Sequence, residues 1–140
     1  MSGPGTMRAM NNTLPLARSL RDELKLALQK DQPLVVMVSL DGCPFCKVAR
    51  RNYLNPLREQ TGLPVVQVDM RSQAPLVDFL ARMTTHDAMT RVWKIKIAPT
   101  VLFFGRGGVE VAERLEGGYI PDFYGAYLEQ RLAQARASLR

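Results

Sequence analysis

The chain has 140 residues, of which 46% are hydrophobic and 23% are charged, enough for one domain with its own core. The net charge is +6, but the basic residues stand in short groups without interleaved aromatic residues, so no nucleic-acid partner is expected. No apolar run approaches the roughly 20 residues of a membrane-spanning helix, so no membrane span is expected.

The first residues show neither the apolar stretch nor the cleavage site of a secretory signal. We expect residues 1–13 to form a flexible segment and residues 14–140 to form the domain. Two explanations remain open for the missing signal. Either the protein stays in the cytoplasm, or the opening letters MSGPGT are vector-derived and replace a signal that was removed.

Leucines recur every four residues from Leu16 to Leu28 and predict one apolar stripe of a helix, with Pro15 in its first turn. The near-continuous apolar run 34–40 is typical of a strand buried on both faces. A second helix is expected over 44–60, kinked or split at Pro56.

The second half begins with another predicted strand over 64–70. Helices are expected over 72–83 and 86–95. The stretch 97–118 reads as strand, glycine-rich turn and strand, which is the pattern of a β-hairpin. An amphipathic helix over 120–136 closes the chain.

This order of elements predicts a three-layer α/β/α domain of the α/β class. Its mixed central sheet should include a C-terminal β-hairpin and be covered by the closing helix. The first two strands are joined by a helix, so they should be parallel with a right-handed crossover.

Cys43 and Cys46 are the only two cysteines, and they lie where the first strand meets the second helix. The unpaired N–H groups of a first helical turn stabilise a thiolate and lower the pKa of such a cysteine below its free value of about 8.5. Pro44 suits this helix start because its missing N–H is not needed there. We therefore expect Cys43 to attack a disulfide, and the more buried Cys46 to resolve the mixed disulfide.

Charged residues surround the pair. Lys47, Arg50 and Arg51 should favour the thiolate, whereas Asp41 should oppose it.

Other uses of the two thiols were weighed. A static disulfide across so short a loop restrains the unfolded chain little. A zinc site needs four ligands, and the single histidine, His86, lies in another segment. A non-catalytic module that holds a soft ion such as Cu(I), or a partner protein, through the two thiols remains an alternative.

The letters CPFC, the segment IAPT at 97–100 and Gly117 together resemble the thioredoxin family over roughly residues 16–137. The resemblance implies a thioredoxin-like fold and a thiol–disulfide oxidoreductase whose redox-active disulfide is its only redox group, with no cofactor. It also implies a cis-proline at Pro99, which leaves the backbone of Ala98 free to pair with a substrate.

The site residues that follow from this resemblance are two catalytic cysteines and five substrate-binding residues. They are Cys43 and Cys46, with Gly42, Pro44, Phe45, Ala98 and Pro99. Protein thiols and disulfides and an upstream redox partner are the expected partners of a monomer.

The sequence also departs from thioredoxin itself. Gly42 stands where thioredoxin has tryptophan, and Met37 stands where the family has a buried aspartate that accepts a proton from the second thiol. Proton transfer from Cys46 must then use water or another group. The opening helix and the long stretch 71–96 look more like the SoxW-like thioredoxin-related proteins of the bacterial envelope. That likeness favours a periplasmic protein, with the cytoplasm as the alternative.

Three further expectations concern packing. Trp93 is expected in the core, and His86 at the surface or capping a helix. The aromatic residues at helical spacing near the C-terminus are expected on the buried side of the last helix; they are Tyr119, Phe123, Tyr124 and Tyr127.

Overall fold

The computed structural model describes residues 13–117 and 121–140. Its central sheet is mixed, because it contains both parallel and antiparallel strand pairs. Its strands are β1 (Leu34–Ser39), β2 (Val65–Asp69), β5 (Thr100–Gly105), β6 (Val109–Glu110) and β7 (Leu115–Glu116). The order across the sheet is β2-β1-β5-β6, and β7 also pairs with β5. The predicted segment 1–13 lies outside the described residues except for Thr13, and the boundary at residue 14 stays a prediction.

Strand directions follow the connections between the strands. β1 is parallel to β2, with Val35 opposite Val65, as predicted for two strands joined by helices. β5 is antiparallel to β1. The predicted hairpin is present, because β6 and β7 both pair antiparallel with β5. A single turn of 3-10 helix, η2 (Arg106–Gly108), connects β5 to β6.

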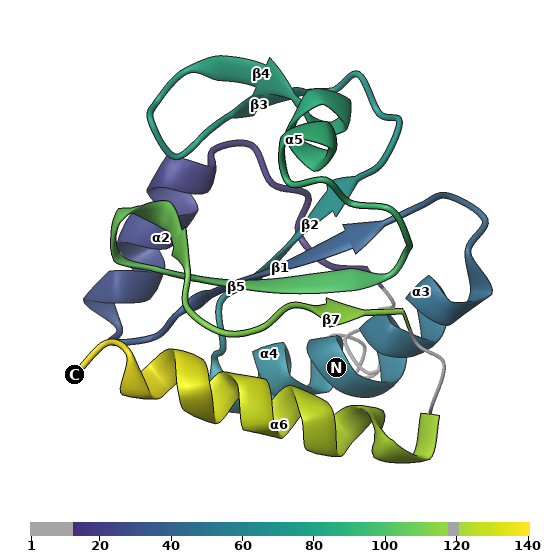
Figure 1. The fold of residues 1–140 in the computed structure, drawn as a ribbon, viewed down its shortest axis with the longest axis vertical. Helices are drawn as coiled ribbons and strands as arrows, with labels where there is room; N and C mark the ends of the chain where they lie inside the picture. Colours follow the sequence, from purple (N-terminus) through teal and green to yellow (C-terminus); the bar gives the residue numbers. More distant parts are fainter. Residues whose placement is uncertain (1–12, 118–120) are drawn as a thin grey trace, which may run out of the picture.

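Helices cover both faces of the sheet, which confirms the predicted three layers (Figure 1). The helical elements are α2 (Leu20–Gln29), α3 (Pro44–Ala49), the π-helical turn η1 (Arg50–Leu54), α4 (Asn55–Thr61), α5 (His86–Val92) and α6 (Pro121–Ala137). In Figure 1, α3, α4 and α6 lie together below the sheet, whereas α2 and α5 lie on its other side. The closing helix is therefore where the sequence predicted it.

Alternate residues of the central strands enter two separate cores. Met37 and Phe103 pack in the cluster that includes Leu128 of α6. Val36 and Leu102 pack in the cluster that includes Leu24 of α2. Because successive side chains of a strand point to opposite faces, an uninterrupted apolar strand fills both layers. Trp93 is buried as predicted, and its ring lies 5.4 Å from that of Phe104.

The helix after the cysteines is interrupted before Pro56. Pro56 has no N–H to donate to the carbonyl four residues earlier, and its ring would crowd that carbonyl. The backbone accommodates Pro56 by forming the π-helical turn, in which the N–H of Asn55 donates to the carbonyl of Arg50. The predicted disturbance at Pro56 therefore takes the form of one wider turn in an otherwise continuous helix.

The predicted helix over 72–83 is wrong. This stretch forms a hairpin of β3 (Pro75–Val77) and β4 (Met83–Thr85). The Asp78 carboxylate accepts the backbone N–H groups of Leu80 and Arg82, each at 2.9 Å, and these bonds hold the pKa of Asp78 below its usual value. A side chain that satisfies backbone donors locally stabilises a turn instead of a helix.

The first helix begins at Leu20, later than predicted. Ser19 is its N-cap, and its hydroxyl accepts the N–H of Asp22 at 3.1 Å. The preceding residues run extended beside β2, where Ala17 N–H donates to the Gln67 carbonyl at 2.9 Å. Leu16 is therefore 46% exposed and outside the buried stripe, and Pro15 is outside the helix.

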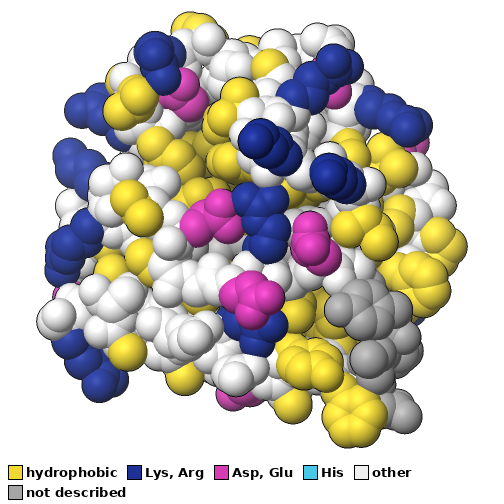
Figure 2. Space-filling view, viewed as in Figure 1, with side chains coloured by type: hydrophobic (Ala, Val, Ile, Leu, Met, Phe, Trp, Pro, Cys, Tyr) yellow, Lys and Arg dark blue, Asp and Glu magenta, His cyan; other side chains and the backbone are white. Residues whose placement is uncertain are grey.

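The aromatic prediction for α6 is only partly right. Tyr124 is buried, but Phe123 is 58% and Tyr127 is 39% exposed; Tyr119 lies outside the described residues. The buried stripe runs through Tyr124, Leu128, Leu132 and Ala135, so Tyr124 is the one predicted aromatic residue among those described that belongs to it. Figure 2 shows hydrophobic side chains gathered at the lower right of this face, over the beginning of α6.

The hydroxyl of Tyr124 is buried and has no hydrogen-bond partner among the described residues. Burial, together with the neighbouring Tyr53, raises the pKa of this hydroxyl far above its ordinary value. The folded state therefore resists deprotonation at this position. A buried polar group without a partner costs about 1–3 kcal/mol.

Tyr124→Phe is expected to leave the free energy of unfolding unchanged or to raise it by up to about 1 kcal/mol at neutral pH, measured by urea denaturation. The unfolded chain releases the tyrosine proton more readily, so the wild type should lose stability as the pH rises above about 10, and the variant should lose less. Leu128→Ala, on the same buried stripe, should cost about 2–5 kcal/mol. A loss above about 1 kcal/mol for Tyr124→Phe would contradict an unpartnered hydroxyl.

Candidate active site

Cys43 is the residue at which the loop after β1 becomes α3. Gly42 has a φ of 79°, which residues with a Cβ atom rarely adopt. This conformation turns the chain from the loop into the helix. Cys43 is the N-cap, and its sulfur accepts the N–H of Cys46 at 3.2 Å. Pro44 follows in the first turn, as predicted.

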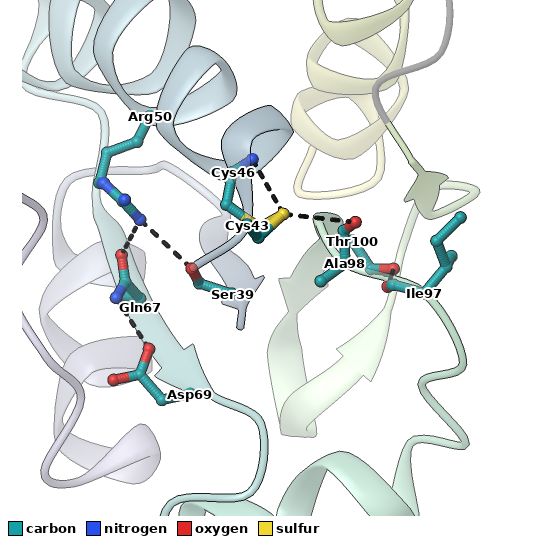
Figure 3. Close-up of a disulfide and its surroundings, with 9 residues drawn as sticks. All are labelled: Ser39, Cys43, Cys46, Arg50, Gln67, Asp69, Ile97, Ala98 and Thr100. Carbon is teal, nitrogen blue, oxygen red and sulfur yellow. Dashed lines mark hydrogen bonds between the residues drawn. A yellow bond between two sulfur atoms is a disulfide. The ribbon is translucent and has the colours of Figure 1, made fainter. Parts of the chain in front are cut away.

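The two cysteines form a disulfide, with their Cα atoms 5.3 Å apart (Figure 3). Cys46 is fully buried, whereas Cys43 is partly exposed. The predicted difference in burial is therefore present. Only the Cys43 sulfur is open to a large reactant from outside.

A second segment, distant in sequence, completes the surroundings of Cys43. The Ala98 carbonyl oxygen lies 3.7 Å from Cys43 Sγ, and the Ala98–Pro99 peptide bond is cis. The segment is held on both sides: Gly117 N–H donates to the Pro99 carbonyl at 2.7 Å, and the Thr100 hydroxyl donates to the Ile97 carbonyl at 2.6 Å. The structure thus brings all the predicted substrate-binding residues to one end of the molecule, either beside Cys43 in the chain or in this segment.

Exposed apolar side chains flank this junction. Phe45, between the two cysteines, is 54% exposed, and Ile97, next to Ala98, is 45% exposed. Two large apolar side chains next to the cysteines and the Ala98–Pro99 segment are thus accessible to another molecule.

A hydrogen-bonded chain of side chains lies on the other side of Cys43. The Arg50 guanidinium donates to Ser39 Oγ at 3.3 Å and to Gln67 Oε1 at 2.8 Å, and Gln67 Nε2 donates to Asp69 Oδ1 at 2.8 Å (Figure 3). These residues line a cavity of about 550 Å³ that also reaches Cys43. The Arg50 guanidinium is thus fixed in the wall of a cavity that Cys43 also lines, and its predicted effect on the thiolate stays a prediction.

The sequence reasoning missed Ser39, Gln67 and Asp69. A signal was available for two of them. Gln67 and Asp69 alternate with buried valines along β2, so they share one face of that strand. Two polar residues on one face of a strand next to the cysteine strand indicate a polar site.

Met37 is fully buried and packs in the same cluster as Cys46. A thioether does not accept a proton at neutral pH, so this position offers no base to the second thiol. The structure therefore has no acidic group at this position, where the thioredoxin family has a buried aspartate.

The prediction that His86 lies at the surface or caps a helix is wrong, because Thr85 is the N-cap of α5. His86 is fully buried at the start of α5. Its Nδ1 accepts the N–H of Asp69 at 3.0 Å, so the other nitrogen carries the proton toward the Ala17 carbonyl oxygen, 2.9 Å away. The ring thereby ties β2 to the segment before α2, a pairing across 69 residues that periodicity does not reveal.

Residues 13–117 and 121–140 contain neither a metal-binding cluster nor a membrane-spanning helix. No three histidine, cysteine or acidic residues of this part gather in a way that could hold a metal ion. None of its helices has the length and apolar character needed to cross a bilayer.

Comparisons with known proteins were made on the sequence and on the fold. The model of the thioredoxin-like domain family matches residues 20–132. No curated protein sequence matches the chain. Three solved structures with the same fold are those of the periplasmic thioredoxin SoxS from Paracoccus pantotrophus, thioredoxin f2 from Chlamydomonas reinhardtii and the Schistosoma mansoni thioredoxin pre-protein.

The similarity to these structures lies in the fold rather than in the sequence. SoxS is 24% identical with a TM-score of 0.50, and the match covers 74% of this chain and 99% of SoxS. Thioredoxin f2 is 18% identical with a TM-score of 0.52, covering 82% and 96%. The Schistosoma protein is 18% identical with a TM-score of 0.56, covering 84% and 97%.

A strand-to-helix cysteine pair at disulfide distance, set in this fold, defines a thiol–disulfide oxidoreductase. The match to the family model extends over most of the chain. The chain therefore belongs to the thioredoxin-like family.

Proposed function

We propose that the protein exchanges electrons with protein thiols and disulfides, with Cys43 as the attacking thiolate and Cys46 as the resolving thiol. One observation carries this proposal. The partly exposed Cys43 sulfur receives an N–H from the first turn of α3, while its fully buried partner is shielded.

The proposed reaction is a two-step exchange. The Cys43 thiolate attacks one sulfur of a substrate disulfide, a mixed disulfide forms, and the other substrate sulfur leaves as a thiolate. Cys46 then attacks Cys43 Sγ and releases the second substrate sulfur. The substrate gains two electrons and the cysteine pair becomes the disulfide, which serves as the redox group without a further cofactor.

Charge and hydrogen bonding support the first step. The Cys46 N–H, 3.2 Å from Cys43 Sγ, favours the negatively charged sulfur, as do the Arg50 guanidinium and the Lys47 ammonium at the same cavity. Met37 supplies no base for the second step. We infer that the Cys46 proton passes to water or to the leaving substrate thiolate.

The substrate-binding role of the surrounding residues is part of the proposal. An extended substrate segment would lie against Ala98 and Pro99, and the exposed rings of Pro44 and Phe45, next to Gly42, would contact its side chains. The 3.7 Å approach of Ala98 to the Cys43 sulfur supports this arrangement. An extended segment pairs through backbone groups, so many protein sequences would be accepted.

The test is equilibration of the protein with graded ratios of reduced and oxidised glutathione, followed by acid trapping and counting of free thiols. We expect a reversible transition of the Cys43–Cys46 pair. A midpoint near the value of about −270 mV known for thioredoxin would make the protein a reductant, and one near about −120 mV would make it a donor of disulfides. A pair that never cycles would contradict the proposal and favour a thiol module that holds a soft ion or a partner.

We also propose that the protein acts as a monomer in the periplasm and receives electrons from an upstream redox partner. The fold it shares with the periplasmic thioredoxin SoxS supports the location. Fractionation of the cells that make the protein natively tests it, and recovery with cytoplasmic markers would contradict it.

A further inference from the structure

The cavity beside Cys43 is lined largely by polar and charged residues. It is lined by the ends of β1 and β2 and by the first turns after the cysteine pair, and its volume of about 550 Å³ falls in the range of small-molecule sites. Cys43 forms part of its wall. A molecule bound there would therefore lie beside the reactive cysteine.

The cations around this cavity outnumber the carboxylates. Lys47, Arg50 and Arg71 line it, against Asp41 and Asp69. A second hollow of about 330 Å³ shares Lys47 and Arg50 with it and adds Arg51. The two adjoining hollows are thus lined by four basic and two acidic residues, and the larger of them includes Cys43.

The hydrogen bonds of the cavity wall hold one cation in a fixed position. Arg50 is oriented by Ser39 Oγ and Gln67 Oε1, and Gln67 is oriented in turn by the Asp69 carboxylate. The Asp69 carboxylate accepts a hydrogen bond from Gln67, with 2.8 Å between Gln67 Nε2 and Asp69 Oδ1. A guanidinium fixed in this way contributes a positive charge at a defined place in the cavity wall, and it loses little conformational freedom when an anion binds nearby.

Arg71 adds an exposed cation to the cavity lining. It lies in the turn that follows β2 and has a φ of 65°. A residue with a side chain is uncommon in this left-handed region. The turn places a long basic side chain at the cavity that Lys47 of α3 also lines.

We propose that this cavity binds the carboxylate of a low-molecular-weight disulfide and thereby selects anionic small disulfides over neutral or cationic ones. The proposal rests on the thiol exchange at Cys43 put forward above. The Cys43 thiolate attacks the nearer sulfur of the bound molecule, the S–S bond of that molecule breaks, and its far half leaves as a thiolate. Cys46 then displaces the near half, which takes up the Cys46 proton.

The test compares three disulfides that differ in charge: the dianionic dithiodipropionate, the neutral hydroxyethyl disulfide and the dicationic cystamine. The protein is reduced with dithiothreitol, freed of it by gel filtration, and mixed with each disulfide; thiol loss gives the second-order rate constant. Dithiothreitol alone gives the intrinsic reactivity of each reagent. Relative to dithiothreitol, we expect the protein to prefer the dianion over the neutral disulfide at low salt, and to lose this preference at high salt.

Variants separate the cavity from the overall charge of the protein. Lys47→Gln and Arg71→Gln should each lower the dianion-to-neutral rate ratio by about two- to fivefold. Lys30→Gln, at the end of α2, changes the net charge equally but lies outside the cavity and should leave the ratio unchanged. The double variant Lys47→Glu, Arg71→Glu should prefer cystamine.

Each outcome decides between the proposals. Equal effects of Lys30→Gln and Lys47→Gln, or no preference in the wild type, would overturn the carboxylate site while leaving thiol exchange intact. Failure of the reduced protein to react even with hydroxyethyl disulfide would instead overturn the proposed function. The neutral reagent also corrects for any change in the reactivity of the Cys43 thiolate itself.

Discussion

Replacing Cys43 by serine is expected to abolish thiol–disulfide exchange, with a loss of about a thousandfold or more in the rate of disulfide reduction. The partly exposed Cys43 sulfur is the atom that a substrate disulfide can reach, since Cys46 is fully buried. A hydroxyl is a far weaker nucleophile than a thiolate at neutral pH. The measurement is the reduction of insulin disulfides by the prereduced protein.

The structure allows this loss to be separated from a folding defect. Serine is among the best N-cap residues, so its hydroxyl can accept the Cys46 N–H that the sulfur accepts now. Cys43→Ser should therefore retain the far-ultraviolet circular dichroism of the wild type reduced with dithiothreitol. Exchange at an undiminished rate in a folded Cys43→Ser protein would mean that Cys46 is the attacking residue.

Replacing Cys46 by serine is expected to give the opposite phenotype, a protein that reacts once and stops. Cys43 can still form the mixed disulfide, but no second thiol is present to release the substrate. We expect an adduct approaching one substrate per protein, seen as added mass under non-reducing conditions and removed by dithiothreitol. In the wild type the same adduct should be scarce because Cys46 lies one helical turn away.

A second replacement guards against misfolding at this buried position. Serine puts a hydroxyl into an apolar site, at a cost of about 1–3 kcal/mol, whereas Cys46→Ala removes the thiol without adding a polar group. Both variants should trap the substrate, and the Cys43→Ser variant should trap none. Trapping on Cys43→Ser but not on Cys46→Ala would reverse the proposed roles.

Much of the fold follows from local patterns in the sequence. The apolar run 34–40 has no polar interruption before Ser39, which is typical of a strand with a layer on each side, and the structure confirms this prediction. The position of the cysteine pair at the strand-to-helix junction was also predicted correctly. Both features depend on neighbours in the chain, and such features are the most accessible from sequence.

The errors arise where distant groups decide the conformation. In 72–83, the apolar residues Leu76, Phe79, Leu80 and Met83 have helical spacing, and yet β3 and β4 form a hairpin. Asp78 accepts two backbone N–H groups of the turn, and this bonding outweighs a periodicity of only four residues. His86 was misplaced because its partners, Ala17 and Asp69, lie far away in the chain.

The cysteine pair and the Ala98–Pro99 segment of the candidate site were predicted, but most of the wall of the neighbouring cavity was missed. The sulfur pair and the Ala98–Pro99 segment carry a recognisable motif, whereas the cavity wall consists of ordinary polar residues. Gln67 and Arg50 acquire their significance only when β2 pairs with β1 and the π-helical turn places Arg50 over both strands. Such a site is a product of tertiary structure.

The cysteine content has a consequence for how the protein reaches its native state. With two cysteines three positions apart, one chain has only one way to pair its thiols internally. Oxidation before, during or after folding therefore leads to the same covalent isomer. The protein can be refolded from a fully oxidised, denatured state without a reshuffling catalyst, and any disulfide-linked by-product must join two chains.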